Sequence, residues 1–157
     1  MNQDEAATLE SKFGIHFPSA YRHAVTDSYP FTDETEELDT NPTSLRTSNA
    51  EYRLTPPWGF PWKLEYWCIG GDGAGGFYFI DTSKDDSTVY YCDHEDMPES
   101  MDDTDRLHTT PFTEFVDYVR DLAKKLEQWN EQMKTKVAKR MWWQFWIPRQ
   151  WPPKRKG

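Results

Sequence analysis

The sequence has few aliphatic side chains, few cysteines and no long apolar run. Only 36% of its 157 residues are hydrophobic. No stretch approaches the ~20 apolar residues that cross a bilayer, and residues 1–9 lack the positive and apolar regions of a secretion signal. These absences argue against a membrane-spanning or exported chain, and we expect one globular domain in the cytoplasm.

The two cysteines, Cys68 and Cys92, are far apart in the chain and belong to no paired metal-binding motif. Structural zinc sites need four Cys or His ligands at characteristic spacings, so the sequence gives little support for one. We predict that both cysteines are reduced and lie in strands, and we leave open whether those strands are neighbours.

Aromatic residues are plentiful where aliphatic ones are scarce. The chain holds 8 Trp, 8 Tyr and 9 Phe, which together make 16% of its residues. A large ring removes more apolar surface from water than an aliphatic side chain does. We therefore expect a core that is built from a modest number of mostly aromatic side chains.

The formal net charge of −9 hides an uneven distribution. Residues 1–132 contain 10 Lys and Arg against 27 Asp and Glu, a net charge of −17. Residues 133–157 contain eight Lys and Arg and no Asp or Glu, a net charge of +8. A negative body repels phosphate backbones, which argues against nucleic-acid binding and favours a basic protein partner. We divide the chain accordingly into a domain over 1–132 and a helical, basic extension over 133–157.

Local patterns predict three helices in the first third of the chain. The first spans 4–13 and stops at Gly14, a residue that favours helix ends. The second begins at Pro18, because proline suits the first helical turn. The third covers 45–52 and is ended by the two prolines that follow it.

Three runs of aromatic and β-branched residues, separated by turn residues, predict consecutive strands over Tyr66–Ile69, Gly76–Thr82 and Thr88–Asp93. Short connections between them favour an antiparallel meander. Both faces of these strands carry apolar residues, so each face needs a cover.

The segment after Pro111 is expected to cover one face of this sheet. Its apolar residues keep helical spacing as far as Met133 and beyond, and Thr109 or Thr110 is expected to cap its first turn. The resulting prediction is an α+β fold: a central, mostly antiparallel sheet with helices packed beside it, a long C-terminal helix and a Trp-rich basic tail.

Two segments suggest chemistry, but each has a simpler structural explanation. Gly70–Gly76 is glycine-rich like a phosphate loop, yet it lacks a Gly-Lys-Ser/Thr ending and Asp72 would repel phosphate, so a tight turn is favoured. Asp93, His94 and Glu95 could supply metal ligands, but neighbouring strand residues point to opposite faces. We expect Asp93 to accept backbone amides at the end of its strand.

No serine or cysteine has the surroundings of an activated nucleophile. We therefore predict no catalytic residue, no cofactor and no metal ion. A metal-dependent hydrolase that uses Asp72, Asp93 and His94 remains a distant alternative.

The segment from Trp142 to Lys156 mixes tryptophans with cations. This composition suits an anionic membrane surface or an acidic groove. Alternatively, its rings fold back onto the domain while the cations remain solvated. The sequence alone does not choose between the two.

Five short motifs follow one another along the chain: Phe17-Pro18-x-x-Tyr21-Arg22, Leu45-x-x-x-Asn49-x-x-Tyr52-Arg53, Trp58-Gly59-Phe60-Pro61-Trp62, Ile69-Gly70-Gly71-Asp72-Gly73-x-Gly75 and Val89-Tyr90-x-x-Asp93-His94-Glu95. In their order and spacing, over about residues 5–130, they resemble the SUKH superfamily, which includes bacterial immunity proteins and fungal cell-wall assembly regulators. The resemblance implies an α+β fold without catalytic residues.

Many bacterial members of that superfamily bind and neutralise a polymorphic toxin, often a nuclease. The resemblance therefore implies direct binding to a cognate toxin, and an acidic surface would steer a basic nuclease towards it. The candidate partner-binding residues, all within the motifs above, are Trp58, Trp62, Asp72, Asp93 and Glu95. The alternative is a scaffold or regulatory module that contacts other proteins or a membrane through the tail.

Overall fold

The computed structural model describes residues 1–26, 37–98 and 107–146, with side chains as far as residue 136. The tail beyond residue 146 lies outside the described residues. The chain divides after Ala123 into two compact units, Met1–Ala123 and Lys124–Gly157. Each unit is described by itself.

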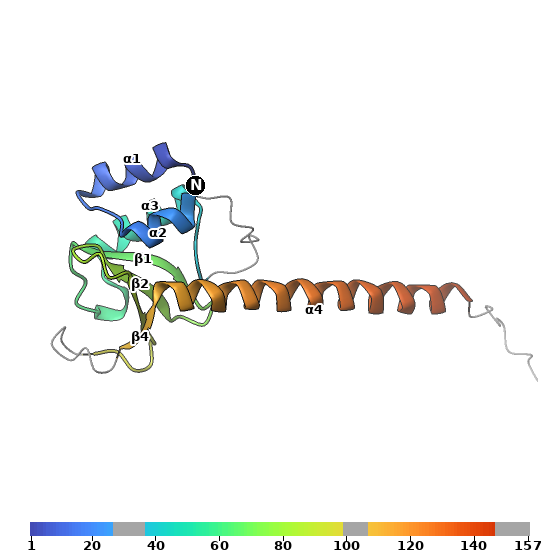
Figure 1. Cartoon of the computed structure of the whole chain (residues 1–157). Coiled ribbons are helices and arrows are strands. Elements are labelled where there is room, and N and C mark those ends of the chain that lie inside the picture. Colours follow the sequence, from blue (N-terminus) through green and yellow to red (C-terminus); the bar gives the residue numbers. More distant parts are fainter. Residues whose placement is uncertain (27–36, 99–106, 147–157) are drawn as a thin grey trace, which may run out of the picture. The chain divides into compact units, whose positions relative to one another are not determined.

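The first unit is built on a four-stranded antiparallel sheet (Figure 1). Its strands are β1 (Tyr66–Gly71), β2 (Phe77–Asp81), β3 (Thr88–Cys92) and β4 (His108–Pro111), and they lie side by side in chain order. The predicted meander of three strands is confirmed. Cys68 and Cys92 are both free and lie on β1 and β3, which β2 separates.

The sequence did not predict β4. Thr109 and Thr110 pair with Tyr90 and Val89 of β3, so the expectation that one of them caps the following helix is wrong. The physical reason is that four residues without apolar alternation carry no strand signal of their own, and the exposed edge of β3 supplies the pairing.

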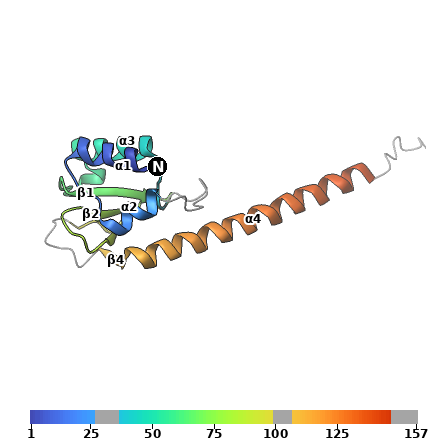
Figure 2. The ribbon, with the colours of Figure 1, turned by 45° about the horizontal axis from the view of Figure 1, so that its top comes forward.

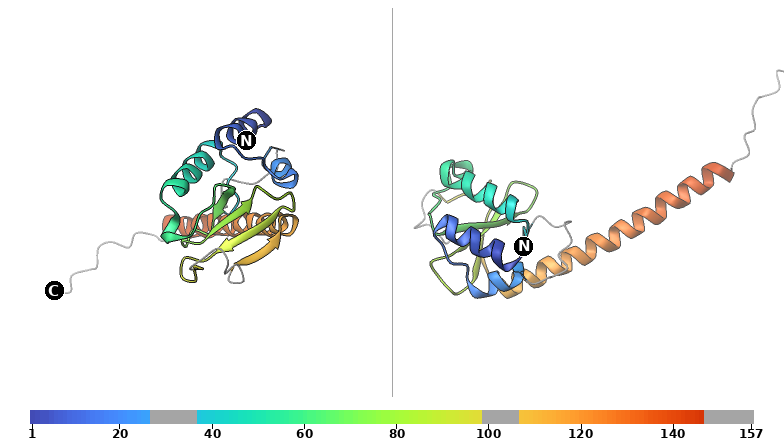
Figure 3. Two further views of the ribbon diagram at one scale, coloured as in Figure 1. Left: turned by 90° about the vertical axis from the view of Figure 1, so that its left-hand side faces the viewer. Right: turned by 90° about the horizontal axis from the view of Figure 1, so that it is seen from above.

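Four α-helices accompany the sheet: α1 (Gln3–Phe13), α2 (Ser19–Thr26), α3 (Pro42–Leu54) and α4 (Phe112–Trp146). Helix α1 ends at Gly14 in the left-handed conformation, with φ of 65°, as predicted. Helix α3 begins three residues before the predicted start, because the Asn41 side chain accepts from the backbone N–H groups of Thr43 and Ser44. In Figure 3, α1 lies between α2 and α3 in both views, and Figure 2 shows α1 alongside α3.

The two faces of the sheet have separate cores. On the first face, which we call the helical face, Trp67, Ile69, Ile80 and Val89 pack against side chains from α1, α2, α3 and the start of α4. From α4, this core takes Phe112, Phe115, Val116 and Val119, all of them buried. The prediction that the segment after Pro111 covers one face of the sheet is confirmed.

On the second face, which we call the aromatic face, the cover comes mainly from the short segment between α3 and β1. Phe60 is buried against Phe77 and Phe79 of β2, and the partly buried rings of Tyr52 and Trp62 complete the cluster. The predicted alternation is therefore correct, because Phe77 and Phe79 lie on this face while Ile80 lies on the other.

In the second unit, the described side chains of α4 are largely exposed. Trp129 is 57% exposed and Met133 is 38% exposed, although both continue the apolar spacing of the buried first turns. Along the apolar positions of α4, the last buried residue with a described side chain is Ala123. Within the described parts of the chain, none of the helices has the length and apolarity needed to cross a membrane.

Candidate functional site

The outer edge of β1 is closed by a side chain rather than by another strand. Asn49, fully buried on α3, donates from Nδ2 to the carbonyl oxygens of Leu45 and Cys68, each at 2.9 Å, and accepts from the Cys68 N–H at 2.7 Å. The Asp39 N–H donates to the Ile69 carbonyl at 2.7 Å. These bonds satisfy the edge of the strand and fix α3 beside it.

The aromatic turn after α3 presents an indole to solvent. Residues Pro57–Gly59 form a 3-10 turn in which Trp58 has a φ of 49°. Of the non-glycine residues in the described ranges, only Trp58 and Ser87 have positive φ. A bulky side chain in this region is strained, and such strain is concentrated at functional positions. The indole is 60% exposed, and its ring lies parallel to that of Phe77, with 6.4 Å between centroids.

The glycine-rich segment between β1 and β2 is organised by Asp72. Its Oδ1 accepts from the N–H groups of Ala74 and Gly76 at 2.8 and 2.9 Å, and its Oδ2 accepts from the Tyr91 hydroxyl at 2.7 Å. Burial acts to raise the pKa of Asp72, but these hydrogen bonds outweigh it and hold the pKa below its ordinary value. The segment is the predicted turn, with positive φ at Gly73 and Gly75.

Close packing reserves two of these positions for glycine. A Cβ on Gly76 would lie 2.5 Å from the Tyr91 hydroxyl oxygen, and a Cβ on Gly75 would lie 3.0 Å from His94 Nδ1. The amides that a phosphate would need are already bonded to Asp72. The turn is therefore held in shape by Asp72, which takes up the Ala74 and Gly76 amides.

The acidic turn after β3 lies beside the exposed indole. Asp93 accepts from the Glu95 N–H at 2.9 Å, as predicted, and its Oδ1 is 3.4 Å from Nδ1 of His94. The ring of His94 lies 5.9 Å from that of Trp58. The Glu95 side chain is 82% exposed. The structure thus brings Trp58 together with the turn that carries two of the predicted carboxylates.

Trp62 occupies a different environment. Its ring packs within the core of the aromatic face, against Tyr52, Phe60, Tyr66, Phe77 and Phe79. Its Nε1 is buried and has no hydrogen-bond partner among the described residues. Trp62 is therefore a partly buried packing residue of the aromatic face.

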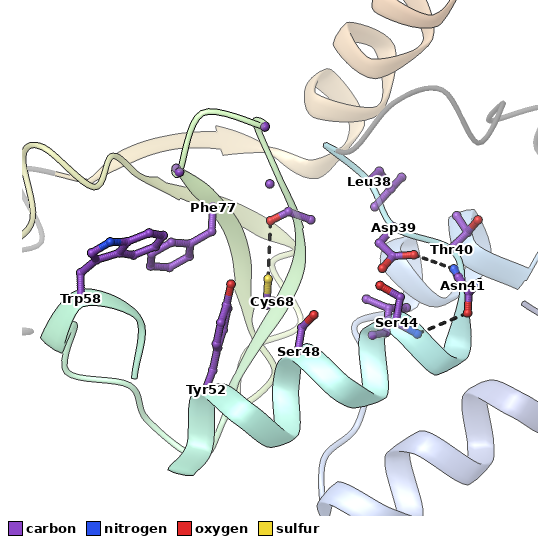
Figure 4. Close-up of a pocket in the computed structure, with 16 residues that line it drawn as sticks. Leu38, Asp39, Thr40, Asn41, Ser44, Ser48, Tyr52, Trp58, Cys68 and Phe77 are labelled. Atoms are coloured by element: carbon purple, nitrogen blue, oxygen red, sulfur yellow. Dashed lines mark hydrogen bonds between the residues drawn. The ribbon is translucent and has the colours of Figure 1, made fainter. Parts of the chain in front are cut away.

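A groove of about 670 Å³ lies between α3, the glycine-rich turn and the Trp58 turn (Figure 4). Figure 4 shows Trp58 and Phe77 at one end, Asp39 at the other, and Tyr52 and Ser48 rising from α3 between them. Among the described residues that line the groove, Asp39 alone carries a charge. The groove thus combines aromatic walls, hydroxyl groups and one carboxylate.

Two ionisable groups of the groove, on Cys68 and Tyr52, stay protonated at neutral pH. Burial raises the pKa of the Cys68 thiol to about 12, so it is not a thiolate nucleophile near pH 7. Burial likewise raises the pKa of Tyr52 to about 12 and keeps its hydroxyl protonated. In the ranges that the structure describes, no three His, Cys, Asp or Glu side chains gather as metal ligands.

The sequence patterns did not identify the groove residues on α3. Ser44, Ser48 and Tyr52 are spaced by four residues and therefore share one face of a helix. That spacing was visible in the sequence, but the face to which it belonged could be identified only after Asn49 had placed α3 against β1.

Comparison with known protein families matches residues 1–132 to the family described as SMI1 / KNR4 family (SUKH-1). No curated protein and no solved structure matched the chain in the corresponding comparisons. The matched region contains all four strands, the groove and the first turns of α4. Since the match covers most of the chain, the protein belongs to the SMI1 / KNR4 (SUKH-1) family.

Proposed function

We propose that this protein is a non-catalytic immunity protein, which neutralises a cognate toxin by binding it directly in the cytoplasm. The observation that carries the proposal is the family match over residues 1–132, which supports an immunity-protein or related regulator domain. The ionisable groups of the groove agree with a binding role, because neither Cys68 nor Tyr52 is activated.

The charge of the matched region supports a basic partner. Residues 1–132 carry 27 acidic against 10 basic residues. Such a field accelerates encounter with a positively charged protein, and nuclease toxins must be positively charged where they hold nucleic acid. Because the steering is electrostatic, the association rate should fall as the ionic strength rises.

We place the contact surface on Trp58, the acidic turn of Asp93 and Glu95, and the adjoining groove. Exposed tryptophans are frequent energetic centres of protein interfaces, especially where a pocket lies beside them. Here the indole is 60% exposed and backed by Phe77, so it would lose little freedom on binding. The carboxylates at its side would pair with cations of the toxin.

The test is co-expression with the toxin encoded beside this gene, followed by measurement of growth and of complex formation. We expect protection and a stable complex, and we expect Trp58→Ala to weaken binding about tenfold or more. A matched control is Trp129→Ala, because that indole is 57% exposed but lies in the second unit. If the wild-type chain gives neither protection nor a complex, the immunity role is wrong.

A regulatory scaffold is the alternative within the same family. It would be indicated if the chain bound endogenous proteins through the Trp58 surface yet gave no protection against the neighbouring toxin. Protection against the toxin distinguishes the two roles. The pair of tryptophan variants tests the contact surface in either case, because a scaffold that uses the groove also loses its partner in Trp58→Ala.

A further inference from the structure

The second unit contains a helical surface that the proposed function does not use. Helix α4 continues through Lys124 and as far as Trp146. Among its described side chains, Trp129 is 57% exposed and Met133 is 38% exposed. Large apolar side chains in water are tolerated singly, but here they begin a series that the sequence continues.

The charge of this part of the chain has one sign. From residue 133 onward there are eight Lys and Arg and no Asp or Glu. Four of the eight tryptophans of the protein, Trp142, Trp143, Trp146 and Trp151, are in the same segment. Cations next to tryptophans suit a surface that is anionic outside and apolar just beneath, which describes a bilayer with acidic headgroups.

A second copy of the chain is a poorer occupant. The apolar residues Trp129, Met133, Val137, Met141 and Phe145 are each four apart. At 100° per residue, each step shifts the stripe by about 40°, so it turns by about 160° along this length. A coiled coil needs a straight seam with a 3-4 repeat, and a 3-4 repeat through Met133 would place Lys136 and Arg140 on that seam.

The sequence at the end of the helix is rich in large apolar residues. Met141, Trp142, Trp143, Phe145 and Trp146 occupy five of its last six positions, which together extend about 9 Å along the axis. At 100° per residue, these five positions span about 200° of the helix circumference, and Arg140 and Gln144 fall on the remaining side. A broad apolar arc beside a polar one suits a helix at the boundary between headgroups and acyl chains. The stretch is far shorter than the ~20 apolar residues of a spanning helix, so it suits a helix that lies at the membrane surface and does not cross the bilayer.

We propose that the part of α4 after Ala123 is a membrane-docking element for anionic lipid. The aromatic end inserts at the bilayer boundary, and cations such as Lys139 and Arg140 contact acidic headgroups. This activity is independent of toxin binding and would hold the acidic domain at a membrane surface. It requires no other macromolecule.

The test is co-sedimentation of the full chain with vesicles of mixed phosphatidylserine and phosphatidylcholine, compared with vesicles of phosphatidylcholine alone. We expect sedimentation with the anionic vesicles that falls as salt rises. Replacing three rings, in Trp142→Ala/Trp143→Ala/Trp146→Ala, should abolish most of it. Replacing two cations, in Lys139→Gln/Arg140→Gln, should weaken it about fivefold for each charge.

A matched control is Lys12→Gln/Arg46→Gln, which removes two exposed cations from the first unit and should bind the vesicles like the wild type. Unchanged thermal unfolding of the domain shows that each variant is folded. The proposal is overturned if both vesicle types sediment the chain equally or not at all. It is also overturned if the three-ring variant keeps its vesicle binding and instead loses a concentration-dependent dimer, which would make a second copy the occupant.

Discussion

The two faces of the sheet differ in how they are covered: one is packed evenly by helices, and the other leaves an exposed indole beside a groove. The helical face is packed by side chains from four helices, and Trp67 at its centre is fully buried. The aromatic face is covered mainly by a short proline-containing segment, which leaves Trp58 exposed and a groove beside it. A face covered by helices buries its side chains evenly, whereas a face covered by a turn can leave a concave, adjustable surface.

The largest expected effect is on the helical face. Trp67 lies with its ring centroid 5.1 Å from those of Phe13 and Phe17, and its Nε1 donates to the Tyr21 hydroxyl at 3.1 Å. Trp67→Ala should lower the free energy of unfolding by about 3–5 kcal/mol through the cavity that it leaves. Urea denaturation measures this loss.

If that variant fails to fold, Trp67→Phe still tests the face. It keeps a ring but loses the hydrogen bond to Tyr21, and it should cost about 1–2 kcal/mol. Trp58→Ala on the other face should cost less than about 1 kcal/mol, because its ring is mostly exposed. Equal losses for Trp67→Ala and Trp58→Ala would contradict the division between the faces.

The next effect concerns Asn49, which joins α3 to the edge of β1. Asn49→Leu keeps the approximate volume but leaves the N–H and carbonyl of Cys68 without their side-chain partners. We expect a loss of about 2–3 kcal/mol in the free energy of unfolding. We also expect faster hydrogen exchange at the Cys68 amide, which NMR can follow. Ser48→Ala, one residue earlier on α3, is the control and should leave both measurements nearly unchanged.

A smaller, pH-dependent effect should come from Asp72. Its folded pKa lies below the ordinary value, so its carboxylate stabilises the fold above the unfolded pKa, and that stabilisation is lost as the pH falls through the folded pKa. At pH 7, Asp72→Asn should cost about 1–2 kcal/mol, since it weakens the charged bonds to Tyr91 and the turn amides.

Denaturation of the wild type and of Asp72→Asn across the acid range tests the contribution of the Asp72 charge. The difference between wild type and Asp72→Asn should shrink towards zero as the pH falls through the lowered pKa of Asp72, below the ordinary range of an aspartate. Tyr91→Phe is the complementary variant, because it removes one of the three bonds and leaves the carboxylate in place. A difference that stays constant with pH would show that the charge of Asp72 contributes nothing.

Much of the sheet was predictable from the sequence, because alternation with a period of two is a local signal. It placed Phe77 and Phe79 on one face and Ile80 on the other before any contact was known. Gly14 likewise marked the end of α1. Both features depend on residues close together in the chain, so neither needs the tertiary structure.

The groove and β4 were not predictable in this way. The groove exists because Asn49 bonds to Cys68, 19 residues away, and because Trp58 stacks on Phe77. Such long-range contacts leave no local period. The same contacts separate two of the predicted partner-binding residues. Trp58 is exposed, whereas Trp62 is partly buried and packs against the core of the aromatic face.

The smallest effect on stability, and the sharpest test of the two faces, is Trp58→Gly. Glycine adopts a φ of 49° without strain, so this variant relieves the backbone while it removes the indole and its contact with Phe77. The relief of backbone strain and the loss of the ring contact oppose each other, so the free energy of unfolding should change by less than about 1 kcal/mol. Toxin binding should nevertheless fall about tenfold or more, as for Trp58→Ala.

If Trp58→Gly were clearly more stable than Trp58→Ala and equally defective in binding, the strain at this position would be retained for recognition. If both variants bound the toxin like the wild type, the aromatic face would have no part in toxin recognition.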